Sequence, residues 1–347
     1  MDKPGSFILS AVQSGRRSLW QLLRVWPYSI KELAQQLERL HAEGWIRPTA
    51  QGWSEIALTE EGKRRAAERP LGLENVCPHC QGKGVQVPSD WTSRFNDIVQ
   101  NRPLPVAKYD QGFMRAEDAV ARVAFIHRMG DLARRDLLLI GDDDLVSIAL
   151  AITGLAGRIA VIDIDDRLQE FIERANREYQ FDIEFHQLDL RQPLPPEFLA
   201  QFDTFITDPV ETLPGIELFL SRAASSLRGR DAAGYFGLTT LEASRQKWHH
   251  IESLLLRMNL VVTDILRDFS IYPEKENQWE QFYTTYEMMI LFGVEGTLPD
   301  CDWYRSSFIR VEAIAEPRPT IEGTSELSLE ELYLDDETVA SPHQEKH

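Results

Sequence analysis

Residues 137–144 read Leu-Leu-Leu-Ile-Gly-Asp-Asp-Asp, an apolar run that passes directly into a glycine and three acids. A short run without polar residues is typical of a strand that is buried on both faces of a parallel sheet. Similar runs occur at 158–162, 183–186 and 202–207, each followed by acids, and helical patterns alternate with the predicted strands. Further strands are predicted at 232–238, 261–267 and 286–292. This alternation predicts an α/β fold, with a doubly wound Rossmann-like domain over residues 116–312.

Acidic residues recur where each of the first four predicted strands ends. They are Asp142, Asp143 and Asp144 after the first strand, Asp163, Asp165 and Asp166 after the second, Asp189 after the third, and Asp208 and Glu211 after the fourth. A single acid in such a loop is usually surface charge. Because ligands of open α/β sheets bind outside the carboxyl ends of the strands, acids repeated at that position are expected to converge on one crevice.

The predicted crevice suits a nucleoside without phosphate. Gly141 is followed by acids instead of a glycine-rich backbone cradle, and Asp142 to Asp144 would repel a pyrophosphate. Asp163 is placed to accept hydrogen bonds from both ribose hydroxyls, and Asp189 to accept one from an adenine amino group. This layout is typical of S-adenosylmethionine-type donors, and the surplus of acids indicates a cationic second substrate.

Helix capping is the alternative role for several of these acids. Asp143 and Asp144 precede a helix predicted at 145–153, and Asp165 and Asp166 precede the next predicted helix. A carboxylate at such a position accepts a hydrogen bond from a backbone N–H that has no partner inside the helix. The sequence leaves both roles open.

The charge of the chain disfavours some partners. The 347 residues carry a net charge of −18, which repels nucleic acid and attracts cations. The first 70 residues hold 11 basic and 8 acidic residues, so the acid excess lies in the rest of the chain. Residues 313–347 combine many acids with scattered Pro, Ser and Thr, which predicts a disordered tail.

The same composition bears on compartment. No apolar run approaches the roughly 18 residues of a transmembrane helix, so no membrane partner is expected. The N-terminus lacks the basic and apolar regions of a secretory signal. Three cysteines do not make a disulfide framework, which predicts a cytoplasmic location.

Residues 1–70 predict a small helical module that ends in a hairpin. The segment 41–66, HAEGWIRPTAQGWSEIALTEEGKRRA, resembles the end of a winged-helix domain. A helix predicted over 30–43 contains no Gly, Pro or Asn, so the turn of a helix-turn-helix is not visible. DNA binding is one interpretation. The weak positive charge favours the other, a packing or dimerisation module, and we expect a homodimer.

Residues 71–115 predict a cysteine knuckle and a linker. Cys77 and Cys80 have the spacing of two ligands of one tetrahedral metal ion. A closed zinc site needs four ligands and no second pair follows, so we expect no metal, with Cys77 and Cys80 as the one place where zinc is an alternative. The Pro-rich residues 85–115 predict an irregular segment that wraps onto the α/β domain.

Three segments of the α/β region resemble one family. LLLIGDDDLVSIALA (137–151), VIDIDD (161–166) and FDTFITDPVETLPG (202–215) are similar to segments of the branched-chain polyamine synthases, the N(4)-bis(aminopropyl)spermidine synthases, known chiefly from thermophilic archaea and bacteria. The N-terminal module and the CPHCQGKG knuckle (77–84) also resemble this family, so the resemblance extends to about residue 312. Ordinary methyltransferases carry a glycine-rich loop in place of GDDD, which makes the resemblance specific.

The resemblance implies an aminopropyltransferase. Such an enzyme moves the aminopropyl group of decarboxylated S-adenosylmethionine to N4 of spermidine. The product is a tertiary and, after a second round, a quaternary branched polyamine, with methylthioadenosine as by-product. The implied partners are this co-substrate and spermidine or related polyamines, and no further cofactor is implied.

The residues at the strand ends suit this reaction. An ammonium cannot attack carbon, so carboxylates are needed to bind the outer ammonium groups and to accept a proton. The implied catalytic residues are Asp208, nearest the attacking nitrogen, with Asp142, Asp143 and Asp144 beside it and Glu211 as a further candidate. The implied donor-binding residues are Gly141, Asp163, Asp165 and Asp189.

Two other functions are alternatives. An amine N-methyltransferase would use intact S-adenosylmethionine, whose additional carboxylate the three aspartates at 142–144 should repel. A winged-helix regulator would sense a small ligand with its α/β domain, but the missing turn and the acidic charge count against it.

Overall fold

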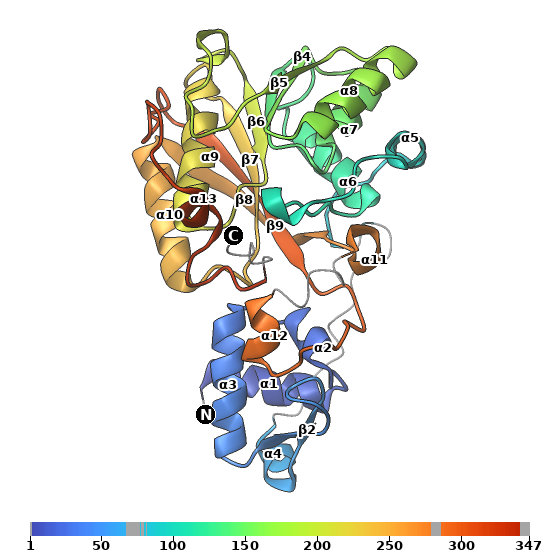
Figure 1. Cartoon of the computed structure of the whole chain (residues 1–347), viewed down its shortest axis with the longest axis vertical. Helices are drawn as coiled ribbons and strands as arrows, with labels where there is room; N and C mark the ends of the chain where they lie inside the picture. Colours follow the sequence, from blue (N-terminus) through green and yellow to red (C-terminus); the bar gives the residue numbers. More distant parts are fainter. Residues whose placement is uncertain (1, 67–76, 78–79, 81, 279–285, 341–347) are drawn as a thin grey trace.

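The structure is a computed structural model that describes residues 2–66, 77, 80, 82–278 and 286–340. Its larger part is built around one sheet (Figure 1). Its smaller part, at the bottom of Figure 1, consists of the N-terminal residues and a segment that returns from near residue 290.

The sheet has seven strands in the order β5-β4-β3-β6-β7-β9-β8. Their bounds are β3 Asp136–Ile140, β4 Arg158–Asp163, β5 Ile183–Gln187, β6 Thr204–Thr207, β7 Ala233–Leu238, β8 Leu260–Ile271 and β9 Arg305–Ala313. Strands β3 to β7 pair in parallel, and β9 runs antiparallel to both β7 and β8. The strand order reverses at β3, which lies between β4 and β6, so a crevice is expected over the carboxyl ends of these strands. The predicted α/β fold with a mostly parallel sheet is confirmed.

Helices cover both faces of the sheet because the strands are apolar on both sides. Leu137 and Leu139 of β3 belong to one core, shared with helices α6, α7 and α8. Leu138 and Ile140 belong to the other, beneath α9 and α10. The helix bounds are α6 Ala116–Arg128, α7 Val146–Thr153, α8 Asp166–Tyr179, α9 Leu213–Ser226 and α10 Arg245–Arg257. Successive side chains of a strand point to opposite faces, so an unbroken apolar run is what a strand between two helical layers requires.

The described N-terminal residues of the smaller part contain four helices and one antiparallel strand pair. They are α1 Lys3–Gln13, α2 Leu19–Leu23, α3 Ile30–Ala42, β1 Ile46–Pro48, β2 Ile56–Leu58 and α4 Glu60–Arg65. Ser29 and Glu32 form a capping box at the start of α3, and Thr59 caps α4. Helix α3 is unbroken, as predicted from the absence of Gly, Pro and Asn.

Buried Arg305 joins the two parts of the molecule. Its guanidinium donates to the carbonyl oxygens of Leu23 at 2.8 Å and Trp26 at 3.0 Å, just after α2. Its Nε lies 2.8 Å from a carboxylate oxygen of Asp268, on β8. Because only 5 % of Arg305 is exposed, these contacts are made out of reach of bulk water.

The last predicted strand is wrong. Residues 286–292 contain the helix α12 (Glu287–Leu291), and the strand that completes the sheet is β9. Met288 and Met289 are buried whereas Ile290 is 70 % exposed, so this apolar segment has one buried side and one exposed side. An apolar run of this length cannot be assigned to strand or helix by periodicity alone.

The predicted irregular segment 85–115 is also wrong in part. It contains the helix α5 (Ser89–Val99) and a 3₁₀ turn, Ala107–Tyr109. Phe95, Ile98 and Val99 have helical spacing and are buried. The prolines of this region mark the boundaries of α5 and do not prevent it. Residues 78–79 and 81 of the predicted knuckle lie outside the described residues.

The predicted disordered tail is wrong for residues 313–340. This segment completes β9 and forms the short helix α13 (Leu329–Tyr333). Val339 is buried, and Asp335 pairs at 2.8 Å with Lys247, a side chain that is only 2 % exposed. The composition of a segment does not show that one of its acids pairs with a cation in a distant part of the fold. Residues 341–347 lie outside the described residues.

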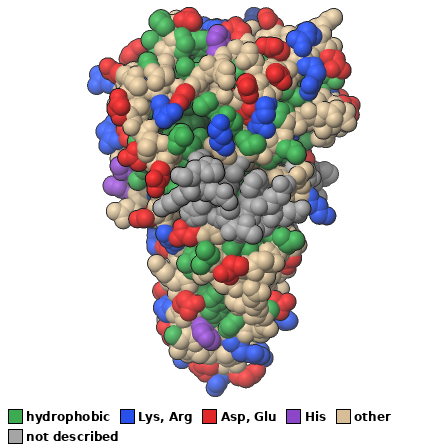
Figure 2. All heavy atoms as spheres, in the orientation of Figure 1, with side chains coloured by type: hydrophobic (Ala, Val, Ile, Leu, Met, Phe, Trp, Pro, Cys, Tyr) green, Lys and Arg blue, Asp and Glu red, His purple; other side chains and the backbone are tan. Residues whose placement is uncertain are grey.

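The surface agrees with the acidic composition. On the described part of the face in Figure 2, Lys and Arg side chains lie among Asp and Glu side chains instead of forming one continuous basic patch. Within the described ranges, no helix combines the length and the apolar character that crossing a bilayer requires.

We expect Arg305→Met to lower the free energy of unfolding by about 3–5 kcal/mol, because two buried carbonyl oxygens lose their charged donor. The matched control is Arg245→Met, which removes the exposed ion pair between Arg245 and Glu32 across the same two parts of the molecule. That change should cost less than about 1 kcal/mol. Urea unfolding of both variants measures the difference, and equal losses would contradict the role assigned to Arg305.

Candidate active site

One cavity opens over the carboxyl ends of the parallel strands, where the predicted acids were expected to converge. Gly141, Asp143, Asp163, Asp189 and Asp208 all line it. Apolar residues line the same cavity, namely Ile162, Ile164, Leu188, Leu190, Val210, Leu218 and Phe219. A cavity lined by both carboxyl groups and apolar side chains can hold an apolar ring and bind polar groups at its edge.

The side chain of Asp163, the last residue of β4, is held by backbone N–H groups that follow β3 and β4. Its two carboxylate oxygens accept hydrogen bonds from the backbone N–H groups of Asp142 and Asp165, both at 2.9 Å. Burial raises the pKa of Asp163, although these two hydrogen bonds act in the opposite direction. Each carboxylate oxygen can accept a further hydrogen bond, so Asp163 remains able to bind hydroxyl groups in the cavity.

Asp142 is turned away from the cavity and toward α7. Its carboxylate accepts hydrogen bonds from the Ser147 backbone N–H, at 3.2 Å, and from the Ser147 hydroxyl. The residue at the N-cap, Leu145, has a left-handed φ of 56° and provides no side-chain cap. The capping role left open for Asp143 and Asp144 is therefore filled by Asp142.

Asp143 and Asp144 are held by the segment that precedes α6. The Gly112 N–H donates to Asp143 at 3.0 Å, and the Met114 N–H donates to Asp144 at 2.5 Å. Burial and the neighbouring carboxylates raise the pKa of Asp143 to about 7. The same two causes raise the pKa of Asp144 well above its usual range. Near neutral pH Asp143 is therefore poised between its charged and neutral forms.

Asp208 follows β6 and is held from behind by Arg122 of α6. Arg122 Nη1 lies 2.7 Å from Asp208 Oδ2, and the Tyr272 hydroxyl donates to the same oxygen at 3.3 Å. The Arg122 side chain is 1 % exposed, whereas 25 % of the Asp208 side chain is exposed. Gly237 of β7 lies against the carboxylate, and a Cβ there would overlap Asp208 Oδ1. The carboxylate thus has a fixed position between a strand and a buried cation.

Asp165 and Asp189 are each paired with an arginine two residues later. Asp165 caps α8, lies 2.5 Å from Arg167 and does not line the cavity, so its capping role is the one observed. Asp189 lines the cavity, and Arg191 holds its carboxylate through Nε at 2.9 Å and Nη2 at 2.6 Å. Of these two predicted donor-binding residues, only Asp189 lies beside the cavity.

Glu211 belongs to a second acidic cluster, separate from the cavity lining. The Thr239 N–H donates to Glu211 Oε1 at 2.8 Å, and Oε2 is buried without a hydrogen-bond donor among the described residues. Burial and the charge of Glu242 raise the pKa of Glu211 well above its usual range. Glu242 is itself 1 % exposed and accepts a hydrogen bond from the Tyr304 hydroxyl at 2.9 Å.

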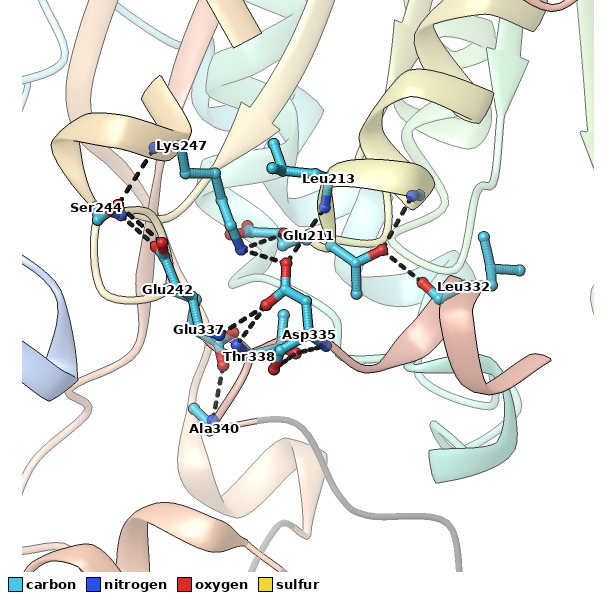
Figure 3. Close-up of polar contacts among 12 residues, drawn as sticks. Glu211, Leu213, Glu242, Ser244, Lys247, Leu332, Asp335, Glu337, Thr338 and Ala340 are labelled. Carbon is cyan, nitrogen blue, oxygen red and sulfur yellow. Dashed lines mark hydrogen bonds and ion pairs between the residues drawn. The ribbon is translucent and has the colours of Figure 1, made fainter. Parts of the chain in front are cut away.

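The C-terminal segment contacts the second acidic cluster, as Figure 3 shows, and it also lines part of the cavity. Leu332 and Tyr333 of α13 line the cavity, and the Thr212 hydroxyl donates to the Leu332 carbonyl at 2.7 Å. Lys247 donates to the Glu211 carbonyl oxygen at 2.9 Å while it pairs with Asp335. A segment predicted to be disordered therefore supplies part of the site.

Sequence analysis does not identify Arg122, Tyr272 or Glu242. For Arg122 a signal exists, because its helical neighbours Ala119 and Val123 are apolar and buried, which places Arg122 on the inner face of α6. A charge at such a position requires a buried partner. The other two residues carry no comparable signal, because their partners come from distant parts of the chain.

The two knuckle cysteines are free thiols, Cys77 exposed and Cys80 half-buried. Within the part of the chain that the structure describes, no group of three or more His, Cys, Asp or Glu side chains is arranged to hold a metal ion.

The parallel sheet, the reversal at β3 and an acidic cavity without a phosphate cradle define a Rossmann-like protein whose candidate site combines carboxyl groups with apolar side chains. Residues 90–340 match the family described as the branched-chain polyamine synthase A C-terminal domain. The chain is 36 % identical over 328 residues to the N(4)-bis(aminopropyl)spermidine synthase of Methanocaldococcus jannaschii, with 91 % of this chain and 89 % of that protein covered. The chain belongs to the branched-chain polyamine synthase family.

Other relatives agree over most of the chain. A protein of the same name from Thermococcus kodakarensis is 36 % identical over 342 residues, with 95 % of this chain and 93 % of that protein covered. The crystal structure of the Thermus thermophilus branched-chain polyamine synthase, in complex with N4-aminopropylspermidine and 5′-methylthioadenosine, is 32 % identical, with a TM-score of 0.82. The match covers 94 % of this chain and 91 % of that chain. The C9 mutein of that enzyme, with the same two molecules, gives 33 % identity and a TM-score of 0.83 over 96 % and 92 % of the two chains.

The raised pKa of Asp143 gives a prediction for stability. Between about pH 4 and 7 the folded chain holds a proton on Asp143 that the unfolded chain does not, so stability falls as pH rises through 7. Asp143→Asn should therefore be more stable than wild type by about 1–3 kcal/mol at pH 8 and similar to it at pH 4.

Chemical denaturation of the ligand-free protein at both pH values tests this expectation. The control is Asp166→Asn, the same change at an exposed residue of α8, which should give no pH-dependent difference. A constant difference between Asp143→Asn and wild type from pH 4 to pH 8 would show that Asp143 titrates normally.

Proposed function

We propose that this protein is an aminopropyltransferase that moves the aminopropyl group of decarboxylated S-adenosylmethionine to N4 of spermidine. Repetition of the reaction makes N(4)-bis(aminopropyl)spermidine and two molecules of methylthioadenosine. Family membership and the two Thermus thermophilus structures with bound product and by-product support the proposal. The observation that carries it is the cavity that Asp143 and Asp208 line together with apolar side chains, with Asp208 ion-paired to the buried cation Arg122.

The donor is proposed to lie in this cavity with its nucleoside against the apolar lining residues. Asp163 would accept hydrogen bonds from the ribose hydroxyls, and Asp189 and Gly141 would lie at the edge of the base and ribose. Decarboxylation leaves the donor with an ammonium and no carboxylate. Because Asp143 would face that end of the molecule, the intact donor would place two like charges together in a partly dry site.

The acceptor is proposed to reach the cavity from the second acidic cluster. Spermidine carries several ammonium groups along an apolar chain, and the two acidic regions offer carboxyl groups at separate places. Glu211 and Glu242 would bind an outer ammonium, while Asp208 would lie beside N4. Both glutamates have raised pKa values because they are buried, and a bound cation would favour their charged forms.

Proton transfer is assigned to Asp143. N4 must be neutral to attack the carbon next to the sulfonium, and a base with a pKa near the working pH removes its proton most effectively. Asp143, with a pKa of about 7, meets this condition better than Asp208, which is ion-paired to Arg122. The leaving group is a neutral thioether, so it needs no acid. In this proposal Asp143 accepts the proton, and Asp208 remains the residue nearest the reacting nitrogen.

The N-terminal residues are proposed to form a winged-helix-like module that supports the enzyme without binding nucleic acid, in a homodimer. The buried contacts of Arg305 and the net charge of −18 support a packing role. Sequence-selective DNA binding below about 1 μM at roughly 0.15 M salt would contradict it.

A comparison of donors tests the reaction. With spermidine and decarboxylated S-adenosylmethionine, mass spectrometry should show first one and then two added aminopropyl groups. With intact S-adenosylmethionine the chain should add no methyl group and should bind the donor at least tenfold more weakly, because Asp143 opposes the carboxylate. Methylated polyamine as the main product would favour the methyltransferase alternative.

Two matched substitutions separate the roles of the acids. Asp208→Asn should reduce kcat by roughly 10²–10⁴-fold with little change in donor binding, because the charge beside N4 is lost. Asp163→Asn should instead raise the KM for the donor while kcat at saturation is largely kept, because Asp163 contacts only the nucleoside. If folded Asp208→Asn retained a kcat within about threefold of wild type, Asp208 would not lie beside the reacting nitrogen.

A further inference from the structure

We propose that Asn277 is a positioning residue that fixes the backbone of residues 111–115 and, through that backbone, the proton acceptor Asp143. Its role in the reaction rests on the proposed function. Asn277 is the last residue of helix α11 (Glu274–Asn277), is 1 % exposed and does not line the cavity. It therefore acts on the site through the residues that it contacts.

The Asn277 side chain holds Phe113 by both of its backbone polar groups. Asn277 Oδ1 accepts a hydrogen bond from the Phe113 N–H at 2.8 Å, and Nδ2 donates to the Phe113 carbonyl oxygen, also at 2.8 Å. Nδ2 donates in addition to the Pro273 carbonyl oxygen at 2.9 Å. The side-chain amide has one favourable orientation, because exchange of its oxygen and nitrogen would place acceptors against acceptors and donors against donors.

The held residue lies in the middle of a segment that contacts the active-site carboxyl groups. Residues 111–115 belong to no helix or strand. The N–H groups of Gly112 and Met114 donate to Asp143 and Asp144. These two donors are two residues apart, which is the spacing of groups that point to the same side of a strand-like chain.

The N–H groups at the alternate positions contact α11 and β8 instead. Phe113 donates to Asn277, and Arg115 donates to the carbonyl oxygen of Ile271, the last residue of β8, at 3.0 Å. A slip of the segment by one residue would exchange the groups on its two sides. Because Asn277 binds both the N–H and the carbonyl of the central residue, it fixes the register in which the carboxyl groups receive their donors.

The planarity of the peptide bond transmits this hold to the carboxyl groups. The Phe113 carbonyl and the Met114 N–H belong to one trans peptide plane and point in opposite directions. When Asn277 fixes that carbonyl on one side, the Met114 N–H is turned toward the other side, where Asp144 accepts it. The Phe113 N–H fixes the preceding plane, which joins the residue whose N–H donates to Asp143.

The titration of Asp143 should respond to this hold. The Gly112 N–H favours the ionised carboxylate and so lowers the pKa of Asp143, whereas burial and the neighbouring carboxylates raise it to about 7. The Arg102 guanidinium, which also lowers this pKa, lies 3.3 Å from the centre of the Phe113 ring. A displaced segment would weaken both contributions, so the pKa of Asp143 would rise. The charged or titratable groups that face Asp143 are Asp142, Asp144, Asp163, Asp208 and Arg102.

The chain contains a matched control for Asn277. Asn176 of α8 accepts a hydrogen bond from the Ile183 N–H at 3.2 Å and donates to the Ile183 carbonyl oxygen at 2.8 Å. Ile183 is the first residue of β5, so this pair lies at the amino end of a parallel strand, opposite to the cavity. Asn176→Ala therefore removes the same two backbone hydrogen bonds as Asn277→Ala without contact to the site.

We expect Asn277→Ala to lower kcat at least tenfold and to change the KM for the donor less than threefold. The proton acceptor is displaced, whereas the nucleoside contacts of Asp163 are kept. The pKa of Asp143 should rise, so the acidic limb of the kcat/KM profile should move by about 0.5–1 toward higher pH. Asn176→Ala should keep kcat within twofold and leave the pH profile unchanged.

Two measurements test these effects. Steady-state kinetics with spermidine and decarboxylated S-adenosylmethionine, over a series of pH values, give kcat, KM and the profile. A ¹³C NMR titration of the aspartate carboxyl groups in the ligand-free protein, assigned with Asp143→Asn, follows Asp143 directly. Circular dichroism and urea unfolding show whether each variant is folded.

Failure of the proposed function and failure of this inference give different results. If the wild type makes no aminopropylated product, the proposed function is wrong and the role of Asn277 in the reaction falls with it. The titration then decides the positioning alone, and an unchanged Asp143 titration in Asn277→Ala overturns it. If the wild type is active but folded Asn277→Ala keeps its kcat, or loses it while Asp143 titrates as in the wild type, the inference is wrong.

A second variant covers the case in which Asn277→Ala does not fold. Asn277→Ser retains a hydroxyl that can make one of the two hydrogen bonds to Phe113. It should change kcat and the Asp143 titration in the same directions by smaller amounts. Wild-type values of both in Asn277→Ser would overturn the inference.

Discussion

Four carboxyl groups gathered at the ends of β3, β4 and β6 are the constraint on which this structure depends. Like charges in such a partly dry place repel one another strongly, so each group is stabilised in a different way. Asp163 accepts two backbone N–H groups, Asp208 pairs with a guanidinium, and burial together with the neighbouring carboxylates raises the pKa of Asp144. Asp143, with a pKa of about 7, is left between the two forms. The cluster is therefore four different groups, which is what a reaction with separate tasks for charge and proton transfer requires.

The groups that contact these carboxyl groups come from distant parts of the chain. The reversal of strand order at β3 gathers the ends of β3, β4 and β6, and the segment before α6 contributes the N–H groups that hold Asp143 and Asp144. A polycationic acceptor would complete the electrostatics, because its ammonium groups would favour the charged forms of the buried acids. Without a ligand, these buried carboxyl groups contribute less to the stability of the fold than an apolar core of the same size would. They are retained because the function of the site requires them.

Three buried cations contact parts of this acidic chain that lie far from them in the sequence. Arg305 donates to the N-terminal part, Lys247 pairs with the C-terminal segment, and Arg122 of α6 pairs with Asp208 at the end of β6. Removing one partner from a buried pair costs several kcal/mol, whereas surface pairs cost little. Three inward-facing cations therefore matter more to this architecture than the many charges on its surface.

The sequence by itself determined what depends on neighbours along the chain. An apolar run between polar residues predicts a buried strand, and an acid just after it must lie at the carboxyl end of that strand, so Asp143, Asp163, Asp189 and Asp208 were found at one cavity. Only the tertiary structure decided which way each acid points and what it meets. Asp142 accepts a hydrogen bond from Ser147, and Arg122 pairs with Asp208. The acidic C-terminal segment is ordered in part because Asp335 pairs with the buried Lys247. These outcomes depend on contacts between residues far apart in the chain, and spacing along the chain carries no information about such distances.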